Sequence, residues 1–474
     1  MIEMLDSDQL LSTSGTSSTS NRQDTTFNED MPLACEYVCE WSPTNLLLPS
    51  HDGGDVYLCL PVNLSEATYF KLCQSKEETK DDGYCDEMAA KLRLASLDRY
   101  ISTIAPLAKS TQRLMACEGA PQSASTAPNH KLVTSSNSGR VINVLQGEIA
   151  HCTRAHADTL VSDDATTCHI LCIHSRYHTD SSEAPKEAAV LATLTHIDAV
   201  GYKSCIRSAV TEHVDYHTSR DRRPLKGTVK ITLHVVGGFN DKKGSSIRIT
   251  EDILLTLAEL SNEFDYRYSQ GPTEVSVSMT LETCAVSSAN DDGAGCPLAR
   301  GIGMDTFSGS IFLAEVEEDA VPSTACVNST ISSRDYLNVK LLPSAQKASA
   351  PTAEGPEATL RSMRLWASAF HVESAITKQL HVIHRSDSDC LWVTPFFFGG
   401  HPAAAGLLQA GDKELIRITS TSPAVEKPNF VRKVRQSLSL MNSSSSMRVF
   451  TKVRGARQPM KFKRVGTNSW ARLQ

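Results

Sequence analysis

The sequence contains no apolar stretch close to the roughly 18 residues that a membrane-spanning helix needs. It also begins without the short apolar core of a secretory signal, because Asp6, Asp8 and a Ser/Thr tract over residues 12–20 occupy that position. Its mean hydropathy is −0.23 and 21% of its residues are charged, values in the range of globular proteins in water. We therefore expect no membrane partner and a location in the cytoplasm or the nucleus.

The glycine-rich segments that hold nucleotide phosphates are missing as well, and no internal repeat recurs with a period of about 20–50 residues. Nucleotide-binding and repeat architectures therefore have no support. The 14 cysteines, in a chain without a predicted secretory signal, are expected to be reduced, and most of them to be small buried apolar residues.

The 474 residues exceed what one compact core usually requires. Composition divides them into an N-terminal extension over 1–30, predicted to be disordered, an α+β domain over 31–340, a linker over 341–357 and a C-terminal part over 358–474 that packs on the same domain. Polar or acidic stretches predict surface insertions within the domain, at about residues 75–88, 117–138, 175–188 and 287–295.

Residue spacing predicts helices over residues 89–107 and 360–371, and a third helix capped by Thr250. Runs of β-branched residues predict strands, over residues 140–145, 169–173, 189–197, 229–236, 275–281, 311–316, 380–384, 391–394, 447–454 and 460–465. The predicted class is α+β, an antiparallel β-sheet sandwich with flanking helices. Gly237 and Gly238, after one of these strands, are typical of a tight turn or of an anion site.

The C-terminal part is strongly basic, with eleven Lys or Arg and no Asp or Glu over residues 432–472. Such a segment can bind nucleic acid. Its basic and apolar residues alternate around a predicted turn at residues 455–459, however, as they do in a hairpin with one solvated face. We therefore expect no nucleic-acid partner.

Reactive side chains are densest between Ser162 and His174, where a polar turn is expected to lead into an apolar strand. Cysteines and histidines in this segment could suggest a zinc site. On a strand, however, Cys168 and Cys172 would lie about 13 Å apart, which is too far for both to bind one metal ion. We therefore expect no metal.

Cys168 needs a partner from another strand, because the neighbouring His169 points to the opposite face. A hairpin centred near Ser182 would place His196 almost opposite Cys168, where cross-strand Cβ atoms lie about 4.5–5.5 Å apart. A thiol and an imidazole so arranged form a cysteine nucleophile with its base. The alternative is that both residues are ordinary members of a buried core.

The segment SDDATTCHI, residues 162–170, closely resembles the active-site segment of the protein N-terminal asparagine amidohydrolase family. Further segments resemble the same family in the same order, namely LTHID at 194–198, VVGGFND at 235–241, WVTPF at 392–396, STSP at 420–423 and PNFV at 428–431. The resemblance covers most of the chain from about residue 141 to the C-terminus, with interruptions, and is poor over residues 35–112.

By this resemblance Cys168 is the nucleophile. The family is also similar to bacterial glutamine deamidases, in which a histidine on the next strand and a hydroxyl six residues before the cysteine complete the site. These positions correspond to His196 and Ser162. The resemblance thus implies a fold like that of cysteine-dependent deamidases and a mechanism without a metal or an organic cofactor.

The implied function is deamidation of an N-terminal asparagine to aspartate with release of ammonia, which feeds the ubiquitin-dependent N-degron pathway. We expect a monomer whose partners are proteins or peptides with N-terminal asparagine. Their free α-ammonium group requires a carboxylate, and Asp163, Asp164 and Asp198 are predicted to bind it. Two alternatives remain: a cysteine-dependent deamidase of glutamines in a protein, and a non-catalytic protein that binds chain ends or RNA.

Overall fold

The computed structural model describes residues 39–49, 55–64, 82–116, 130–133, 139–179, 189–218, 226–269 except 242, 274–316 except 294–295, 378–395 and 402–420. Towards the C-terminus it also describes residues 423, 426, 430–432, 434, 435, 438, 452–453, 456–467 and 470–473. The predicted extension over 1–30, the predicted linker over 341–357 and the predicted helix over 360–371 lie outside these residues.

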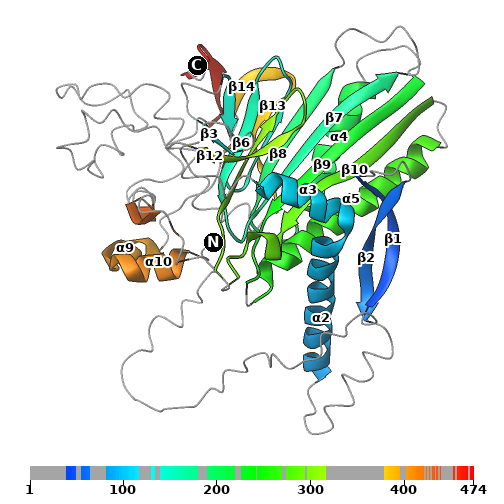
Figure 1. Ribbon diagram of the computed structural model, residues 1–474. Helices are drawn as coiled ribbons and strands as arrows, with labels where there is room; N and C mark the ends of the chain where they lie inside the picture. The colour runs from blue at the N-terminus through cyan, green and yellow to red at the C-terminus, as the bar shows by residue number, and fades with distance from the viewer. Residues whose placement is uncertain are drawn as a thin grey trace.

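Two β-sheets form the centre of the protein (Figure 1). The larger has eleven strands in the order β18-β17-β14-β13-β5-β8-β7-β9-β10-β1-β2, and the smaller has five in the order β3-β12-β11-β6-β4. The strands of the larger sheet are β1 (Cys39–Leu48), β2 (Val56–Leu64), β5 (Glu148–Cys152), β7 (His169–Thr179), β8 (Val190–Ile197), β9 (Lys226–Gly237), β10 (Glu274–Val286), β13 (His381–Arg385), β14 (Ser388–Val393), β17 (Met460–Arg464) and β18 (Trp470–Arg472). Those of the smaller sheet are β3 (His130–Val133), β4 (Val141–Asn143), β6 (Thr159–Ala165), β11 (Arg300–Asp305) and β12 (Ile311–Val316).

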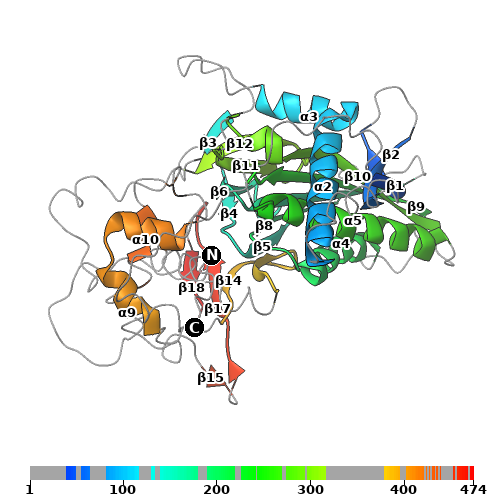
Figure 2. The ribbon, with the colours of Figure 1, turned by 90° about the horizontal axis from the view of Figure 1, so that it is seen from below.

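Helices α4 (Lys203–Thr218) and α5 (Ser245–Ser269) cover one face of the larger sheet, and the smaller sheet covers the other (Figure 2). The alternation of side chains along each strand builds these layers. In β7, Leu171 and Ile173 pack with apolar residues of the helices, whereas Ile170 and Cys172 pack with the smaller sheet. The larger sheet therefore has one apolar core on each side.

The larger sheet is mixed rather than antiparallel. Three neighbouring pairs run parallel: β9 with β10, β10 with β1, and β5 with β13. The first pair is parallel because α5 connects its strands and returns the chain to the same end of the sheet. The predicted antiparallel arrangement is thus wrong for these pairs, whereas the α+β class with large sheets is confirmed.

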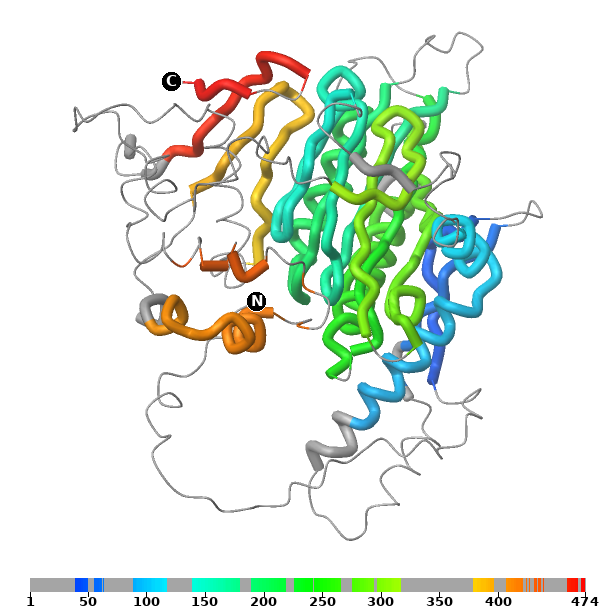
Figure 3. Tube along the Cα trace, turned by 60° about the vertical axis from the view of Figure 1, so that its left-hand side comes forward, coloured from blue at the N-terminus to red at the C-terminus, as the bar shows by residue number. Residues whose placement is uncertain are grey.

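The C-terminal strands extend the larger sheet, since β13 pairs with β5 and is followed by β14, β17 and β18. Figure 3 shows β13 and β14, in yellow, beside the cyan strands of the first half of the chain. In β17, Met460 and Phe462 are buried while Lys461 and Lys463 are exposed, so the predicted alternation of basic and apolar residues is present. Of the predicted strand over 447–454, the structure describes only β15 (Lys452–Val453), which pairs with β16 (Ala456–Arg457).

The predicted helix over 89–107 is two helices, α2 (Asp82–Thr103) and α3 (Ala105–Met115). Pro106 lies in the first turn of α3, where its missing N–H is tolerated, but a helix coming from α2 cannot continue through it. No helix in the described part of the chain is long and apolar enough to cross a membrane.

The prediction that Thr250 caps the next helix is wrong, because α5 already begins at Ser245. The carboxylate of Asp241 takes the capping role. It accepts backbone N–H groups of Lys243, Ser245 and Ser246 at 3.1, 3.0 and 2.7 Å.

Several predicted insertions contain regular structure. Residues 82–88 belong to α2, residues 130–133 form β3, and β7 extends to Thr179. Between 287 and 290 the chain forms a 3₁₀ turn, η2 (Ser287–Asn290), whose two end residues are buried. Part of this polar stretch therefore lies in the protein interior.

Candidate active site

Three strands from the two sheets meet at the predicted site. Ser162 lies in β6 of the smaller sheet, Cys168 directly before β7, and His196 in β8 of the larger sheet. Their exposed fractions are 0%, 8% and 3%. The polar turn expected before β7 is shorter than predicted, because residues 159–165 are strand and only 166–168 form the turn.

Cys168 and His196 lie on the same face of the larger sheet, the one covered by the smaller sheet. The pairing of β7 with β8 places His169 opposite Ile197 and Ile170 opposite His196. The predicted register, with His196 almost opposite Cys168, is therefore displaced by two residues. A shift of two leaves both side chains on one face as diagonal neighbours, within reach of long side chains.

Ser162 and His196 form a hydrogen bond between the two sheets, with 2.8 Å between Oγ and Nδ1. The imidazole Nε2 is buried and makes no hydrogen bond to any residue that the structure describes. If Nδ1 carries the proton and donates it to Ser162, the lone pair of Nε2 is available as a base. The hydrogen bond to Ser162 thus orients the imidazole ring.

Burial keeps both members of the pair neutral. It raises the pKa of the Cys168 thiol to about 12, and the carboxylates of Asp198 and Glu426 act in the same direction. It lowers the pKa of His196 to about 4, which the charges of Asp198 and Asp163 oppose. The resting site therefore holds a thiol and a neutral imidazole.

The backbone at Cys168 is fixed by the turn that follows β9. The N–H of Gly238 donates to the carbonyl oxygen of Cys168 at 2.8 Å. Gly237 and Gly238 have φ values of +120° and +69°, and a Cβ at Gly238 would lie 2.6 Å from the ring of His169. These positive φ values favour glycine, and the missing side chains allow a close approach to Cys168 and His169.

Asn290 of η2 holds this turn from the other side. Its side-chain nitrogen lies 3.0, 2.9 and 2.9 Å from the carbonyl oxygens of Gly237, Gly238 and Ala285. Its own oxygen accepts the Nε–H of Arg300 at 2.8 Å. Because Asn290 is fully buried, these bonds fix the position of the turn that contacts Cys168.

The three predicted carboxylates have different surroundings. Asp198 is 4% exposed and accepts hydrogen bonds from Gln146 Nε2 at 3.0 Å and from the Tyr202 hydroxyl at 2.9 Å. Asp163 accepts the backbone N–H of Asp164 at 2.7 Å and that of Val316 at 3.2 Å.

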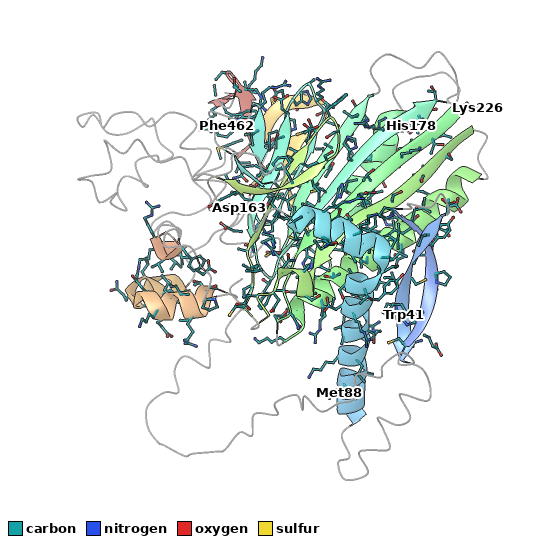
Figure 4. All side chains as sticks on the ribbon, in the orientation of Figure 1. Trp41, Met88, Asp163, His178, Lys226 and Phe462 are labelled. Atoms are coloured by element: carbon teal, nitrogen blue, oxygen red, sulfur yellow. The ribbon has the colours of Figure 1, made fainter. Side chains whose placement is uncertain are left out.

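Asp164 is exposed and has a φ of +61°. Figure 4 shows Asp163 on the smaller sheet, far from His178 and Lys226 at the opposite end of β7 and β9. Of the three carboxylates, Asp198 is therefore the buried charge beside both Cys168 and His196.

His169 occupies the opposite face of β7, as alternation requires. Its Nε2 lies 2.7 Å from the Thr250 hydroxyl of α5, and its side chain is fully buried. Among the described residues, no group of three or more His, Cys, Asp or Glu could hold a metal ion.

A second thiol and imidazole, those of Cys152 and His384, lie 3.2 Å apart from Sγ to Nδ1. The same Nδ1 lies 2.8 Å from the carbonyl oxygen of His151, so this nitrogen carries the proton and cannot accept one from the thiol. Both side chains are 0% exposed. This pair therefore lacks the geometry of an activated nucleophile.

No sequence pattern pointed to Gln146, Tyr202, Asn290, Arg300 or Glu426. Asn290 lies in a polar stretch typical of a surface loop, so no local pattern marks it as buried. Glu426 lies between the segments STSP and PNFV, and their resemblance to a known family was the available signal.

Comparison with known proteins gives a consistent result. The profile of a family described as protein N-terminal asparagine amidohydrolase matches residues 131–342 and 337–472. A protein of that name from Sus scrofa is 25% identical over 293 residues, which are 60% of this chain and 69% of the relative. Proteins of the same name from Mus musculus and Homo sapiens are 25% and 23% identical with the same coverage. Because the profile matches well over half of the chain, including Ser162, Cys168 and His196, the chain belongs to the protein N-terminal asparagine amidohydrolase family.

Proposed function

We propose that this protein hydrolyses the side-chain amide of an N-terminal asparagine, giving an N-terminal aspartate and ammonia. The named relatives support the reaction and the substrate class. The aspartate end formed in this way is a substrate for arginylation and then for the ubiquitin-dependent N-degron pathway. The observation that carries the proposal is the hydrogen bond between Ser162 and His196, which joins the two sheets on the face of β7 and β8 that also carries Cys168.

In the first half of the reaction, His196 Nε2 takes the proton of Cys168 while the sulfur attacks the carboxamide carbon. Proton transfer coupled to attack suits this site, because both groups are neutral at rest. Backbone N–H groups near Cys168 bind the oxygen that becomes negative. The buried charge of Asp198 stabilises the imidazolium that forms, since it opposes the loss of basicity that burial causes.

In the second half, the imidazolium protonates the leaving nitrogen, the C–N bond breaks and ammonia departs from a thioester on Cys168. Water, deprotonated by the same imidazole, attacks the thioester carbon and breaks the C–S bond. The proton returns to sulfur, and the product carries a carboxylic acid in place of the amide. In this mechanism His196 carries out every proton transfer.

Ammonia release from matched peptides tests the proposal. A peptide with N-terminal asparagine should release ammonia, whereas peptides with N-terminal glutamine or acetylated N-terminal asparagine should release far less. Release from an internal glutamine instead would favour the glutamine deamidase, and binding without release would favour the non-catalytic alternative.

Replacement of Ser162 by alanine tests the orienting hydrogen bond. We expect kcat to fall about 10- to 100-fold with little change in KM, because His196 loses the hydrogen bond that orients its ring. The matched control is Ser175→Ala, since the Ser175 hydroxyl is equally buried and lies 2.7 Å from His213 Nδ1 on the other face of the sheet. Equal losses of kcat in the two variants would assign Ser162 a purely structural role.

The pH dependence of Cys168 alkylation by iodoacetamide tests the neutral resting state. Because the thiol pKa is raised to about 12, the thiolate fraction should grow about tenfold per pH unit between about pH 7 and pH 10, with no plateau. The imidazole, with a pKa of about 4, stays neutral throughout this range. Mass spectrometry of the peptide that contains Cys168 measures the rate. A plateau near neutral pH would instead show a preformed thiolate and imidazolium pair.

A further inference from the structure

A continuous chain of hydrogen bonds lies between the larger sheet and helix α4. Ser175 Oγ lies 2.9 Å from His217 Nε2 and 2.7 Å from His213 Nδ1. Thr193 Oγ1 lies 2.8 Å from His213 Nε2 and 2.7 Å from His151 Nδ1. All five side chains are buried. Three imidazoles are thus joined by two hydroxyls, in what we call the imidazole–hydroxyl chain.

The fold brings these residues together from four elements. His151 of β5 is paired with Thr193 of β8, and Ser175 of β7 lies on the same face of the sheet. His213 and His217 are four residues apart on α4, so they lie on one side of the helix. Apolar residues of α4 pack on the same face of the sheet. The imidazole–hydroxyl chain therefore fastens α4 to three strands.

The number of hydrogens in the neutral chain matches the number of contacts. Each of the four contacts between nitrogen and oxygen needs one hydrogen. The two hydroxyls supply two, neutral His213 supplies one, and either His151 or His217 supplies the fourth. Among the described residues, neither hydroxyl has a third partner. The neutral chain is therefore completely hydrogen-bonded.

One added proton can enter the chain without loss of a hydrogen bond. If it lies on His213, both nitrogens of that ring donate, and the two hydroxyls donate outwards to His151 and His217. A second proton makes two N–H groups point at the same hydroxyl, that of Ser175 or Thr193. The hydrogen of this hydroxyl then has no acceptor in the chain. The second proton thus costs a hydrogen bond in addition to the burial of another positive charge.

The charged groups near His151 give little compensation for a positive charge. Burial lowers the pKa of His151 to about 4. The carboxylate of Glu212 on α4 opposes this shift, whereas His384 and Arg385 of β13 add to it. Glu212 also accepts a hydrogen bond from the Ser386 hydroxyl at 2.7 Å. At neutral pH this end of the chain is therefore uncharged.

The middle and the other end of the chain have no carboxylate among the contacts described. Burial lowers the pKa of His213, and the other imidazoles of the chain and His174 on the opposite face of β7 act in the same direction. Around His217 lie aromatic rings, with centroid distances of 6.4 Å to Tyr177 and 5.1 Å to Tyr216. His213 is therefore neutral as well.

The ionic contacts between α4 and α5 cannot replace the chain. Lys203 pairs with Glu259 and Arg207 with Glu263, but these side chains are about a third to a half exposed. Exposed ion pairs contribute little to stability. The buried hydrogen bonds to the sheet are therefore important for holding α4.

We propose that the imidazole–hydroxyl chain is an acid-sensitive contact, which holds α4 against the larger sheet while its imidazoles are neutral and favours opening of the helix once two of them bind protons. This device is separate from the proposed function, because it lies on the face of the sheet opposite to Cys168. When α4 opens, the imidazoles reach water and titrate near their ordinary pKa of about 6.5. The docked helix is therefore most stable above about pH 6.5, and it loses stability as the pH falls towards about 4.

Amide hydrogen exchange of the full chain at pH 7 and pH 5.5 tests the proposal, after correction for the intrinsic exchange rate. Each imidazole that is neutral when docked should raise the opening equilibrium constant about 8-fold between these pH values. For His151 and His213 together we expect about 60-fold faster exchange in α4. Amides of β9 report global unfolding and should exchange more slowly than those of α4 at both pH values.

His213→Gln removes one titrating group but keeps one donor and one acceptor. It should reduce the pH response of α4 about 8-fold. A purely structural role would instead speed α4 exchange equally at both pH values.

His234→Gln is the matched control, since His234 is also buried and lies 3.1 Å from Thr283 Oγ1, outside the chain. It should leave the pH response of α4 unchanged. If His213→Gln does not fold, the response of the wild type still decides. The proposal is overturned by pH-independent opening of α4, by equal effects of the two variants, or by α4 amides that exchange no faster than those of β9.

Discussion

Replacement of Cys168 by alanine is expected to abolish ammonia release from peptides with N-terminal asparagine. Without the sulfur of Cys168 no thioester can form at this position. The free energy of unfolding should change by no more than about 1–2 kcal/mol, because one small side chain replaces another. Ammonia assays and thermal unfolding measure the two quantities separately.

Cys172→Ala is the control for this result. Cys172 lies on the same strand face and is 0% exposed, so the variant makes a similar change in the same core. It should keep most of the activity. Full ammonia release by Cys168→Ala in a clean preparation would remove the covalent mechanism, and equal losses in the two variants would point to a shared structural cause.

Replacement of His196 by alanine is expected to lower kcat by about 100-fold or more, the usual contribution of a positioned acid and base. The same residue deprotonates the thiol, protonates the leaving ammonia and activates water, so its loss affects every step. KM should change little, since His196 contributes no charge to the binding of the peptide in its neutral state.

His169→Ala is the matched control, because it truncates a histidine that is just as deeply buried one residue from Cys168 but on the opposite face. It should reduce stability through the lost contact with Thr250 and keep a larger share of the activity. If His169→Ala were the inactive variant and His196→Ala the active one, the assignment of faces in β7 and β8 would be wrong.

The sequence was sufficient to predict which strands carry Cys168 and His196 and that the two residues share a face. The predicted strands correspond to β7, β8, β9, β10 and β12, because β-branched residues mark the interior of a buried sheet. The register was displaced by two residues for a physical reason. A shift of two keeps every side chain on its face, so the apolar pattern fits both registers equally well.

Other features of the site could not be predicted from local patterns. Asn290 donates hydrogen bonds to the carbonyl oxygens of Gly237 and Gly238. They could not be predicted, because only the tertiary fold determines that this polar residue is buried. The parallel pairing of β9 with β10 depends on α5, which returns the chain to the same end of the sheet.

The pairing of β13 with β5 has a consequence for synthesis of the chain. Ile149 pairs with Val382, which is 233 positions later, and every residue of β5 is buried in the finished sheet. At about 5–20 residues per second, the ribosome needs roughly 10–50 s to supply that partner. During this interval the edge of β5 that later pairs with β13 has no partner strand. Such an unpaired edge recruits other chains into aggregates. A nascent chain that stalls before residue 381 should therefore need protection by chaperones, although the strands that carry Cys168 and His196 are already complete.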